Sequence, residues 1–167
     1  VDDRILPTNN RVVLATDQIR ERFDGREGSP IEIMARNADE ASVVDYAQRL
    51  SQEPHITRVK TSTGVYEGGS LVSPADPYVG KYSSGEWTRI VAIADVEPRS
   101  PEGESVTADI RSISSSFDEV LVGGSAATYT DALNAITSNL PYAALWIILS
   151  TMLLLFLFTG SLILPIK

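Results

Sequence analysis

The stretch Tyr142–Ile166 reads YAALWIILSTMLLLFLFTGSLILPI and decides what kind of fold this chain can have. No charged side chain occurs between Asp131 and Lys167. A helix of about 20 such residues, rising about 1.5 Å per residue, covers the roughly 30 Å hydrocarbon core of a bilayer. The alternative is a helix buried in a soluble core, which needs a larger domain than the rest of the chain provides. We therefore predict one transmembrane helix within residues 141–167.

The chain before this stretch is polar and acidic. The whole sequence of 167 residues has a formal net charge of -8, no Cys and a single His. A negative surface argues against nucleic acid as a partner, because phosphate binding needs a basic face. The lack of Cys excludes disulfides and Cys-ligated metals. We therefore expect residues 1–140 to form a domain in water, followed by the membrane helix.

The few charges around the apolar stretch predict its orientation. Arg111 is the nearest basic residue before it, whereas Lys167 follows it at once. Because Lys and Arg favour the cytoplasmic side of a membrane helix, we expect the domain to lie outside the cytoplasm. The chain starts at Val1 without a Met and stops directly after the apolar stretch. We therefore expect it to be part of a longer polypeptide.

Hydrophobic periodicity in the acidic part predicts an α+β fold. Residues 31–36 alternate between apolar and longer side chains, which is typical of a strand, and residues 87–96 are β-branched and apolar, which indicates a central strand. The expected strands are 31–36, 56–63, 87–96 and 118–122, and the expected helices are 10–23, 39–52, 100–117 and 126–140. This order is βαββαβ between two outer helices. It is the ferredoxin-like arrangement, in which right-handed crossovers place both inner helices on one face of a four-stranded sheet.

The connection Gly64–Glu86 is too long for an ordinary hairpin loop. It carries three tyrosines, Tyr66, Tyr78 and Tyr82. Long connections of this kind are often functional or disordered. The sequence leaves two interpretations open, a segment that contacts a partner or covers a site, and a segment exposed to solvent without fixed structure.

Few residues are candidates for chemistry. His55 follows Pro54 in a loop and is a candidate ligand for a metal or haem, but the alternative is a surface His, and no Cys or second His completes a site. Gly123-Gly124-Ser125 offers backbone N–H groups and a hydroxyl at a strand-to-helix turn. The alternative there is a tight turn that needs glycine. We expect no enzyme activity, cofactor or metal.

Both ends of the chain carry a family resemblance. Residues Thr159–Lys167 resemble the end of a membrane helix in the mycobacterial large membrane proteins (MmpL) of the resistance-nodulation-division (RND) superfamily, whose pattern is close to Phe-Gly-Ser-x-x-Leu-Pro-x-Lys. Thr159 departs from this pattern, since Phe is usual there. Val122-Gly123-Gly124, followed by a helix with Asp131 and then Leu140-Pro141, looks like the approach to that helix. Arg4-Ile5-Leu6-Pro7 and the helix after it look like the start of the family's second periplasmic domain, although Thr8-Asn9-Asn10 departs from the acidic residues often found there.

The resemblance implies the second of two periplasmic porter domains, followed by one of about a dozen membrane helices. It implies a proton-driven transporter in the inner membrane that exports long-chain or mycolate-type lipids to the mycobacterial cell envelope. The expected partners are the lipid, the membrane, the other periplasmic domain and the other membrane helices of the same polypeptide. Haem is a further candidate, because some family members are linked to haem uptake. The resemblance does not identify the residues that line the lipid route.

The residues that carry the resemblance are candidates for structural or coupling roles. They are Leu6, Pro7, Gly123, Gly124, Asp131, Pro141, Ser161 and Pro165. The proton-relay residues of the family lie in other membrane helices, so no residue of this chain receives that role. Two other interpretations remain, a membrane-anchored extracytoplasmic binding or sensor module, which includes haem binding, and a tail-anchored cytosolic protein.

Overall fold

A computed structural model describes residue 7 and residues 9–22, 28–75 and 82–160 of the chain. By their internal contacts these residues divide into two compact units, one that ends at Thr130 and one that begins at Asp131. Each unit is described by itself.

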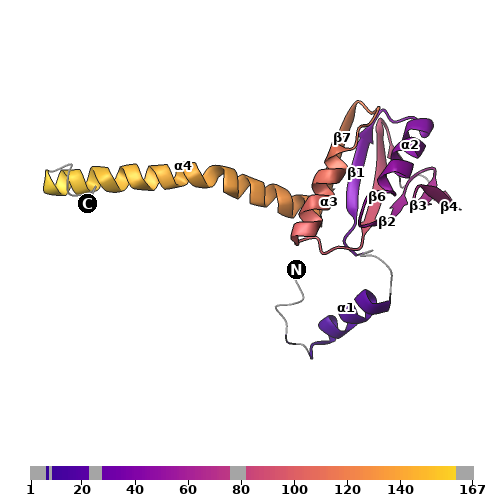
Figure 1. Ribbon diagram of the computed structural model, residues 1–167, viewed down its shortest axis with the longest axis horizontal. Coiled ribbons are helices and arrows are strands. Elements are labelled where there is room, and N and C mark those ends of the chain that lie inside the picture. The colour runs from indigo at the N-terminus through magenta and orange to yellow at the C-terminus, as the bar shows by residue number, and fades with distance from the viewer. Residues whose placement is uncertain (1–6, 8, 23–27, 76–81, 161–167) are drawn as a thin grey trace. The chain divides into compact units, whose positions relative to one another are not determined.

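The elements of Figure 1 follow the predicted order with additions. The helices are α1 (Arg11–Arg22), α2 (Glu40–Leu50), α3 (Pro101–Ser112) and α4 (Ser125–Thr159). The strands are β1 (Ile31–Arg36), β2 (Ile56–Lys60), β3 (Gly64–Glu67), β4 (Ser70–Pro74), β5 (Ser83–Ser84), β6 (Trp87–Ala94) and β7 (Glu119–Gly124).

The sheet has the strand order β4-β3-β2-β6-β1-β7, and β5 pairs with β6. All of these pairings are antiparallel. The inner part, β2-β6-β1-β7, contains the four predicted strands in the order that a ferredoxin-like fold requires, with α2 after β1 and α3 after β6. The predicted α+β fold is therefore confirmed.

One hydrophobic core joins the sheet to α2 and α3. In β1, Ile31, Ile33 and Ala35 are buried, as the alternation predicted. The core cluster consists of Ile31, Ile33, Val43, Tyr46, Ala47, Leu50, Ile56, Val59, Tyr66, Ile90, Ala92, Ala94, Val106, Ile110 and Ala126. Because residues of α2 and α3 share this cluster with β1 and β6, both helices cover the same face of the sheet, as expected. We call the opposite face, which carries Glu32 and Arg89, the outer face.

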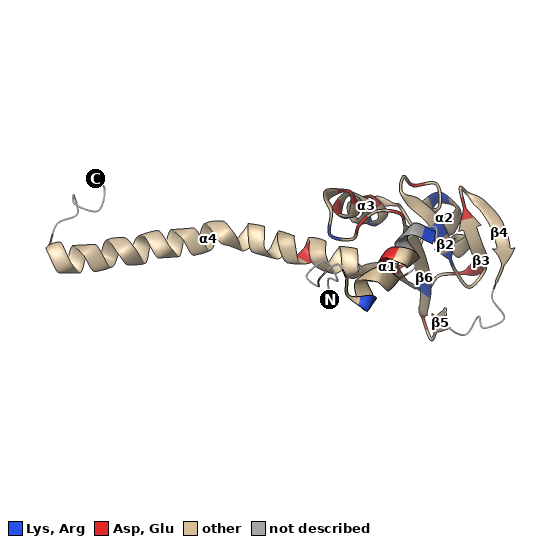
Figure 2. Ribbon diagram, turned by 90° about the horizontal axis from the view of Figure 1, so that it is seen from below, with Lys and Arg blue, Asp and Glu red and all other residues tan. Residues whose placement is uncertain are grey.

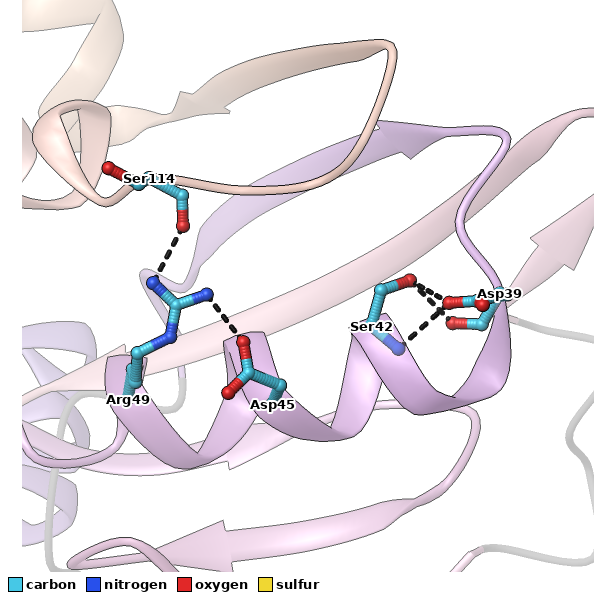
Figure 3. Close-up of polar contacts among 5 residues, drawn as sticks. All are labelled: Asp39, Ser42, Asp45, Arg49 and Ser114. Atoms are coloured by element: carbon cyan, nitrogen blue, oxygen red, sulfur yellow. Dashed lines mark hydrogen bonds and ion pairs between the residues drawn. The ribbon is translucent and has the colours of Figure 1, made fainter.

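Helix α2 begins at a side-chain cap. The Asp39 carboxylate accepts a hydrogen bond from the backbone N–H of Ser42 at 2.8 Å and another from the Ser42 hydroxyl, as Figure 3 shows. Such a cap satisfies N–H groups that have no partner inside the helix. These two hydrogen bonds lower the pKa of Asp39, because they favour the ionised carboxylate.

The connection 64–86 differs from the predicted long loop. It contains β3 and β4, which form a hairpin beside β2, and the short strand β5. The turn between β3 and β4 is Gly68-Gly69, and both glycines have positive φ, which the favoured two-residue hairpin turns require. Strand β2 accordingly ends at Lys60 and does not extend to residue 63. Tyr78 lies outside the described residues.

The ends of two predicted helices differ in the structure. α3 ends at Ser112, and residues 113–118 form an irregular connection to β7, which we call the strap. α4 is one continuous helix that ends at Thr159, where the N–H of Gly160 bonds to the Phe156 carbonyl at 2.8 Å, and residues 161–166 of the predicted span lie outside the described residues. In α1, helical spacing places Val12 and Ile19 on one apolar stripe, and both side chains are more than half exposed.

Candidate functional site at the junction of the sheet and the membrane helix

β7 passes directly into α4, and two glycines shape this junction. Gly123 lies opposite Glu32 and Gly124 opposite Ile31 in the ladder with β1. Gly124 has a φ of 103°, and a Cβ atom there would lie 2.5 Å from the carbonyl oxygen of Pro30. Gly123 is less restricted, because its nearest atom would be the Glu32 carbonyl oxygen at 3.9 Å. The close approach of β7 to the start of β1 therefore requires glycine at position 124.

The first turns of α4 are packed against the sheet domain. Ala126, Ala127 and Thr130 are buried, and Ala126 belongs to the core cluster. The Thr130 hydroxyl donates to the Ala126 carbonyl at 3.0 Å, which satisfies a buried polar group within the helix. Small side chains allow a helix backbone to approach a sheet closely. The beginning of α4 is therefore fixed to the domain that it leaves.

Asp131 and Pro141 lie further along α4 and not at the junction itself. Asp131 is the first residue of the second unit and has an exposed side chain. Pro141 lies inside the helix and has no N–H to donate to Thr137. Nearby, Ser138 and Asn139 donate to the Ala135 carbonyl at 3.2 and 2.6 Å. Asp131 and Pro141 are ten positions apart in the helix, a rise of about 15 Å.

The other predicted site residues are not brought to the junction by any contact that the structure describes. Pro7 precedes α1, and its carbonyl accepts a hydrogen bond from the N–H of Asn10 at 2.9 Å. Leu6, Ser161 and Pro165 lie outside the described residues. Their proposed roles therefore stay predictions.

The second unit presents apolar side chains to its surroundings. α4 is long and apolar enough to cross a membrane, and its most apolar part is not buried by any other part of the chain that is described. Figure 2 shows that α4 carries no Lys or Arg and that its acidic colour is confined to its beginning. The hydroxyls of Ser150 and Thr159 donate to the carbonyls of Ile147 and Leu155, at 3.0 and 2.7 Å. These polar groups are therefore satisfied within the helix, as a lipid environment requires.

The outer face of the sheet is charged, which the sequence analysis did not anticipate. Arg89 donates two hydrogen bonds to Glu32, at 2.6 and 2.7 Å, and this pairing raises the pKa of Arg89. Two further ion pairs, Arg36 with Glu86 at 2.9 Å and Arg58 with Glu67 at 2.7 Å, lie on the same sheet. The alternation of Glu32, Met34 and Arg36 in β1 was the signal for this polar face. The sheet thus carries charged side chains on its outer face, whereas α4 carries none after Asp131.

His55 lies in the turn before β2. Its Nδ1 atom is 3.1 Å from an Asp95 oxygen, and its side chain is about half exposed. In residue 7 and residues 9–22, 28–75 and 82–160, no group of three or more His, Asp or Glu side chains is placed to hold a metal ion. Among these residues the structure therefore gives His55 an acidic neighbour but no set of three ligands.

The similarity to known proteins extends over nearly the whole chain. The family model described as "MMPL family" matches residues 4–166. Over its full length the chain is 25% identical to the "Trehalose monomycolate exporter MmpL3" of Mycolicibacterium smegmatis and covers 16% of that protein. It is 24% identical, again over its full length, to the "Probable trehalose monomycolate exporter MmpL3" of Mycobacterium leprae and covers 17% of it. The chain thus spans about a sixth of the length of these curated relatives.

Proposed function

This chain belongs to the MMPL family, and we propose that it forms a periplasmic porter domain and the following membrane helix of a proton-driven lipid exporter. The observation that carries the proposal is the extent of the family match, which includes both the sheet domain and α4. The two relatives are named as an exporter and a probable exporter of trehalose monomycolate. A long-chain or mycolate-type lipid is therefore the proposed cargo, and the inner membrane is the proposed location.

The structural role of the chain in such an exporter is non-enzymatic. An apolar cargo needs a sheltered path at the membrane surface, which shape and apolar contacts can provide without reactive groups. The charged outer face suits a domain that stands in water, and the apolar part of α4 suits lipid. The position of Arg111 and Lys167 relative to the span supports the periplasmic side for the domain.

α4 is the proposed coupling element between the two surroundings. Its first turns are held in the sheet domain by the buried Ala126 and Thr130, and the same helix continues without interruption to Thr159. A rigid helix that is shared by two units transmits a displacement of one to the other. Gly124 and Pro141 are the proposed points where its direction is set, at the junction and within the helix.

Other parts of the same polypeptide are the proposed protein partners. In α1, Val12, Leu14 and Ile19 are each more than half exposed, although they are large and apolar. Exposed apolar side chains gathered on one element are typical of an interaction surface. Since the chain spans about a sixth of its relatives, a second periplasmic domain and further membrane helices are the expected occupants.

The side of the membrane is tested by labelling with thiol reagents, in a full polypeptide from which any Cys outside this chain has been removed; this chain itself has no Cys. Ser105 is an exposed residue of α3, so Ser105→Cys in the full polypeptide should react with a membrane-impermeant maleimide in intact cells. Lys167→Cys, at the other end of the span, should react only after permeabilisation. The reverse pattern would place the domain in the cytoplasm and overturn this part of the proposal.

The activity is tested with the full polypeptide in proteoliposomes that contain trehalose monomycolate. We expect lipid to reach the far leaflet only when a proton gradient is imposed, and a protonophore should stop it. Export that continues unchanged after the gradient is dissipated would contradict the proton-driven mechanism. A full polypeptide with α4 as its only membrane helix would instead support an anchored binding or sensor module.

A further inference from the structure

Tyr46 is a buried polar residue that the proposed function does not use. Its side chain is 1% exposed, and its hydroxyl has no hydrogen-bond partner among the described residues. Burial raises its pKa to about 12, so the hydroxyl keeps its proton and remains a donor. A buried donor without a partner is rare in native proteins, because leaving it unpaired costs about 1 to 3 kcal/mol. The hydroxyl therefore calls for an acceptor.

Arg49 supplies a positive charge that acts on Tyr46. It follows Tyr46 by three residues in α2, so the two side chains lie on the same side of the helix. Its guanidinium donates to the Ser114 carbonyl and to the Asp45 carboxylate, both at 2.7 Å, as Figure 3 shows. A guanidinium has five donors, so further acceptors can be accommodated.

The strap, residues 113–118, covers these two residues. The ring of Phe117 packs against that of Tyr46 with 5.3 Å between the ring centroids. Ile113 and Phe117 are partly buried against the core. The strap is also tied to the connection between β1 and α2 through Asn37, whose amide donates to Asp118 at 2.7 Å. The hydrogen bonds of Asn37 and Arg49 to the strap are exposed and stabilise it by little, so separating the strap from α2 costs mainly the apolar contacts of Ile113 and Phe117.

We propose that Tyr46 and Arg49 form a head-group site for an oxyanion on an alkyl chain, and that the strap covers it. The Tyr46 hydroxyl and the Arg49 guanidinium donate to the anion, which replaces the Ser114 carbonyl as a partner of Arg49. The alkyl chain lies against the rings of Tyr46 and Phe117. Two donors from the same side of α2, one of them cationic, favour a carboxylate or a phosphate over a neutral alcohol. The site deepens the proposed function, on which it rests, by naming where an amphiphile contacts the domain.

The site is tested with the full chain in nanodiscs of phosphatidylcholine and a fatty acid that carries a photoactivatable diazirine. After illumination, peptide mass spectrometry should find the label on the strap and on α2. Unlabelled laurate or dodecyl phosphate should compete, and the stronger of the two identifies a carboxylate or a phosphate as the natural anion. Equal competition by dodecanol would overturn the assignment of an anion, and label confined to α4 would overturn the site.

Two buried tyrosines provide matched variants. Tyr46→Phe should lower labelling of the strap by about fivefold, the factor that one lost hydrogen bond gives. It should leave thermal stability unchanged or raised, because the unpaired hydroxyl is gone. Tyr66 is equally buried, but its hydroxyl pairs with Thr63 at 2.9 Å. Tyr66→Phe should therefore lower stability and leave labelling unchanged.

Further variants separate this inference from the proposed function. Arg49→Gln should also reduce labelling, and Phe117→Leu should change the labelled positions within the strap. Unchanged labelling in Tyr46→Phe and Arg49→Gln would overturn the site while the maleimide pattern still supports a periplasmic domain. A cytoplasmic maleimide pattern would contradict the proposed function whatever the label shows.

Discussion

The sheet domain and the second unit use similar apolar side chains in opposite ways. In the sheet domain, Ile33, Leu50 and Ile90 are fully buried by their own chain. In α4, Ile147, Leu153 and Phe158 are more than half exposed. The domain therefore gains its apolar stabilisation from its own core, whereas α4 has no partner for these side chains in the described part of the chain and is expected to obtain it from lipid or from other helices.

Charged residues placed in the apolar part of α4 should produce the largest effect, a loss of membrane insertion. They would remove the difference in surroundings between α4 and the sheet domain. Replacing Leu149 and Leu153 with Arg is expected to disfavour insertion by about 3 to 4 kcal/mol for each residue. The measurement is the fraction of the chain that resists alkaline extraction from membranes. Leu149→Ile with Leu153→Ile is the matched control and should insert normally. If the double Arg variant inserts as well as the wild type, α4 is not held by lipid.

A cavity in the core should lower the stability of the sheet domain and leave membrane insertion of α4 unchanged. Ile90 lies in β6 and is 0% exposed, so Ile90→Ala is expected to lower the free energy of unfolding by about 2 to 5 kcal/mol. Leu121, on the outer face of β7, is 51% exposed, and Leu121→Ala should change it by about 0.5 kcal/mol or less. Thermal unfolding followed by circular dichroism measures both variants. Insertion of α4 should be the same in each, and a loss of insertion in Ile90→Ala would show that the two units are not independent.

At the junction of β7 and α4, replacing Gly124 should lower the stability of the sheet domain, whereas replacing Gly123 should have little effect. Gly124→Ala is expected to lower the free energy of unfolding by about 1 to 3 kcal/mol, because its Cβ would meet the Pro30 carbonyl and its φ is positive. Gly123→Ala has room for a Cβ and should have a much smaller effect. The same thermal measurement compares them. Equal effects would contradict the close approach of β7 to β1.

The sequence predicted best where a single local pattern controls the structure. Strand β1 was predicted with its observed bounds, because alternate residues of one short segment face one core. The hairpin of β3 and β4 was missed although Gly68-Gly69 is a hairpin signal, because its flanking strands are short and β4 is exposed throughout. The pairing of Arg49 with Ser114 was not predictable, since 65 positions separate the two residues and only the folded chain brings them together.

The functional residues also divide into those that a local pattern predicted and those that depend on the tertiary fold. Gly123 and Gly124 were recognised from the turn that they form, and the structure supplies the reason for Gly124, which is the nearby Pro30 carbonyl. The helix at 39–52 was predicted, but the environment of Tyr46 within it was not. Its ring packs against Phe117 of the strap, a contact between distant parts of the sequence. Side-chain environments of this kind follow from the tertiary fold, and periodicity does not contain them.

Lowering the pH should produce the smallest effect. It should reduce the stability of the sheet domain and leave α4 unchanged. Hydrogen bonds from Ser42 lower the pKa of Asp39 below 3.8, so the ionised cap stabilises the folded state. A carboxyl whose pKa is lower in the folded state contributes its full stability above the unfolded pKa and loses it as the pH falls through the folded pKa. Asp39→Asn keeps an acceptor for the helix N–H groups but cannot titrate. The wild type should therefore lose more thermal stability than Asp39→Asn as the pH is lowered below 3.8.

The acid effect also sharpens the contrast with the span. No Asp, Glu, His, Lys or Arg lies between Asp131 and Lys167, so lowering the pH changes no charge within the apolar stretch. Insertion of α4 should therefore be the same at neutral and acidic pH while the sheet domain loses stability. If insertion falls in parallel with unfolding of the domain, the packing of Ala126 and Thr130 at the junction helps to hold the span, and α4 couples the two regions in the direction from domain to membrane.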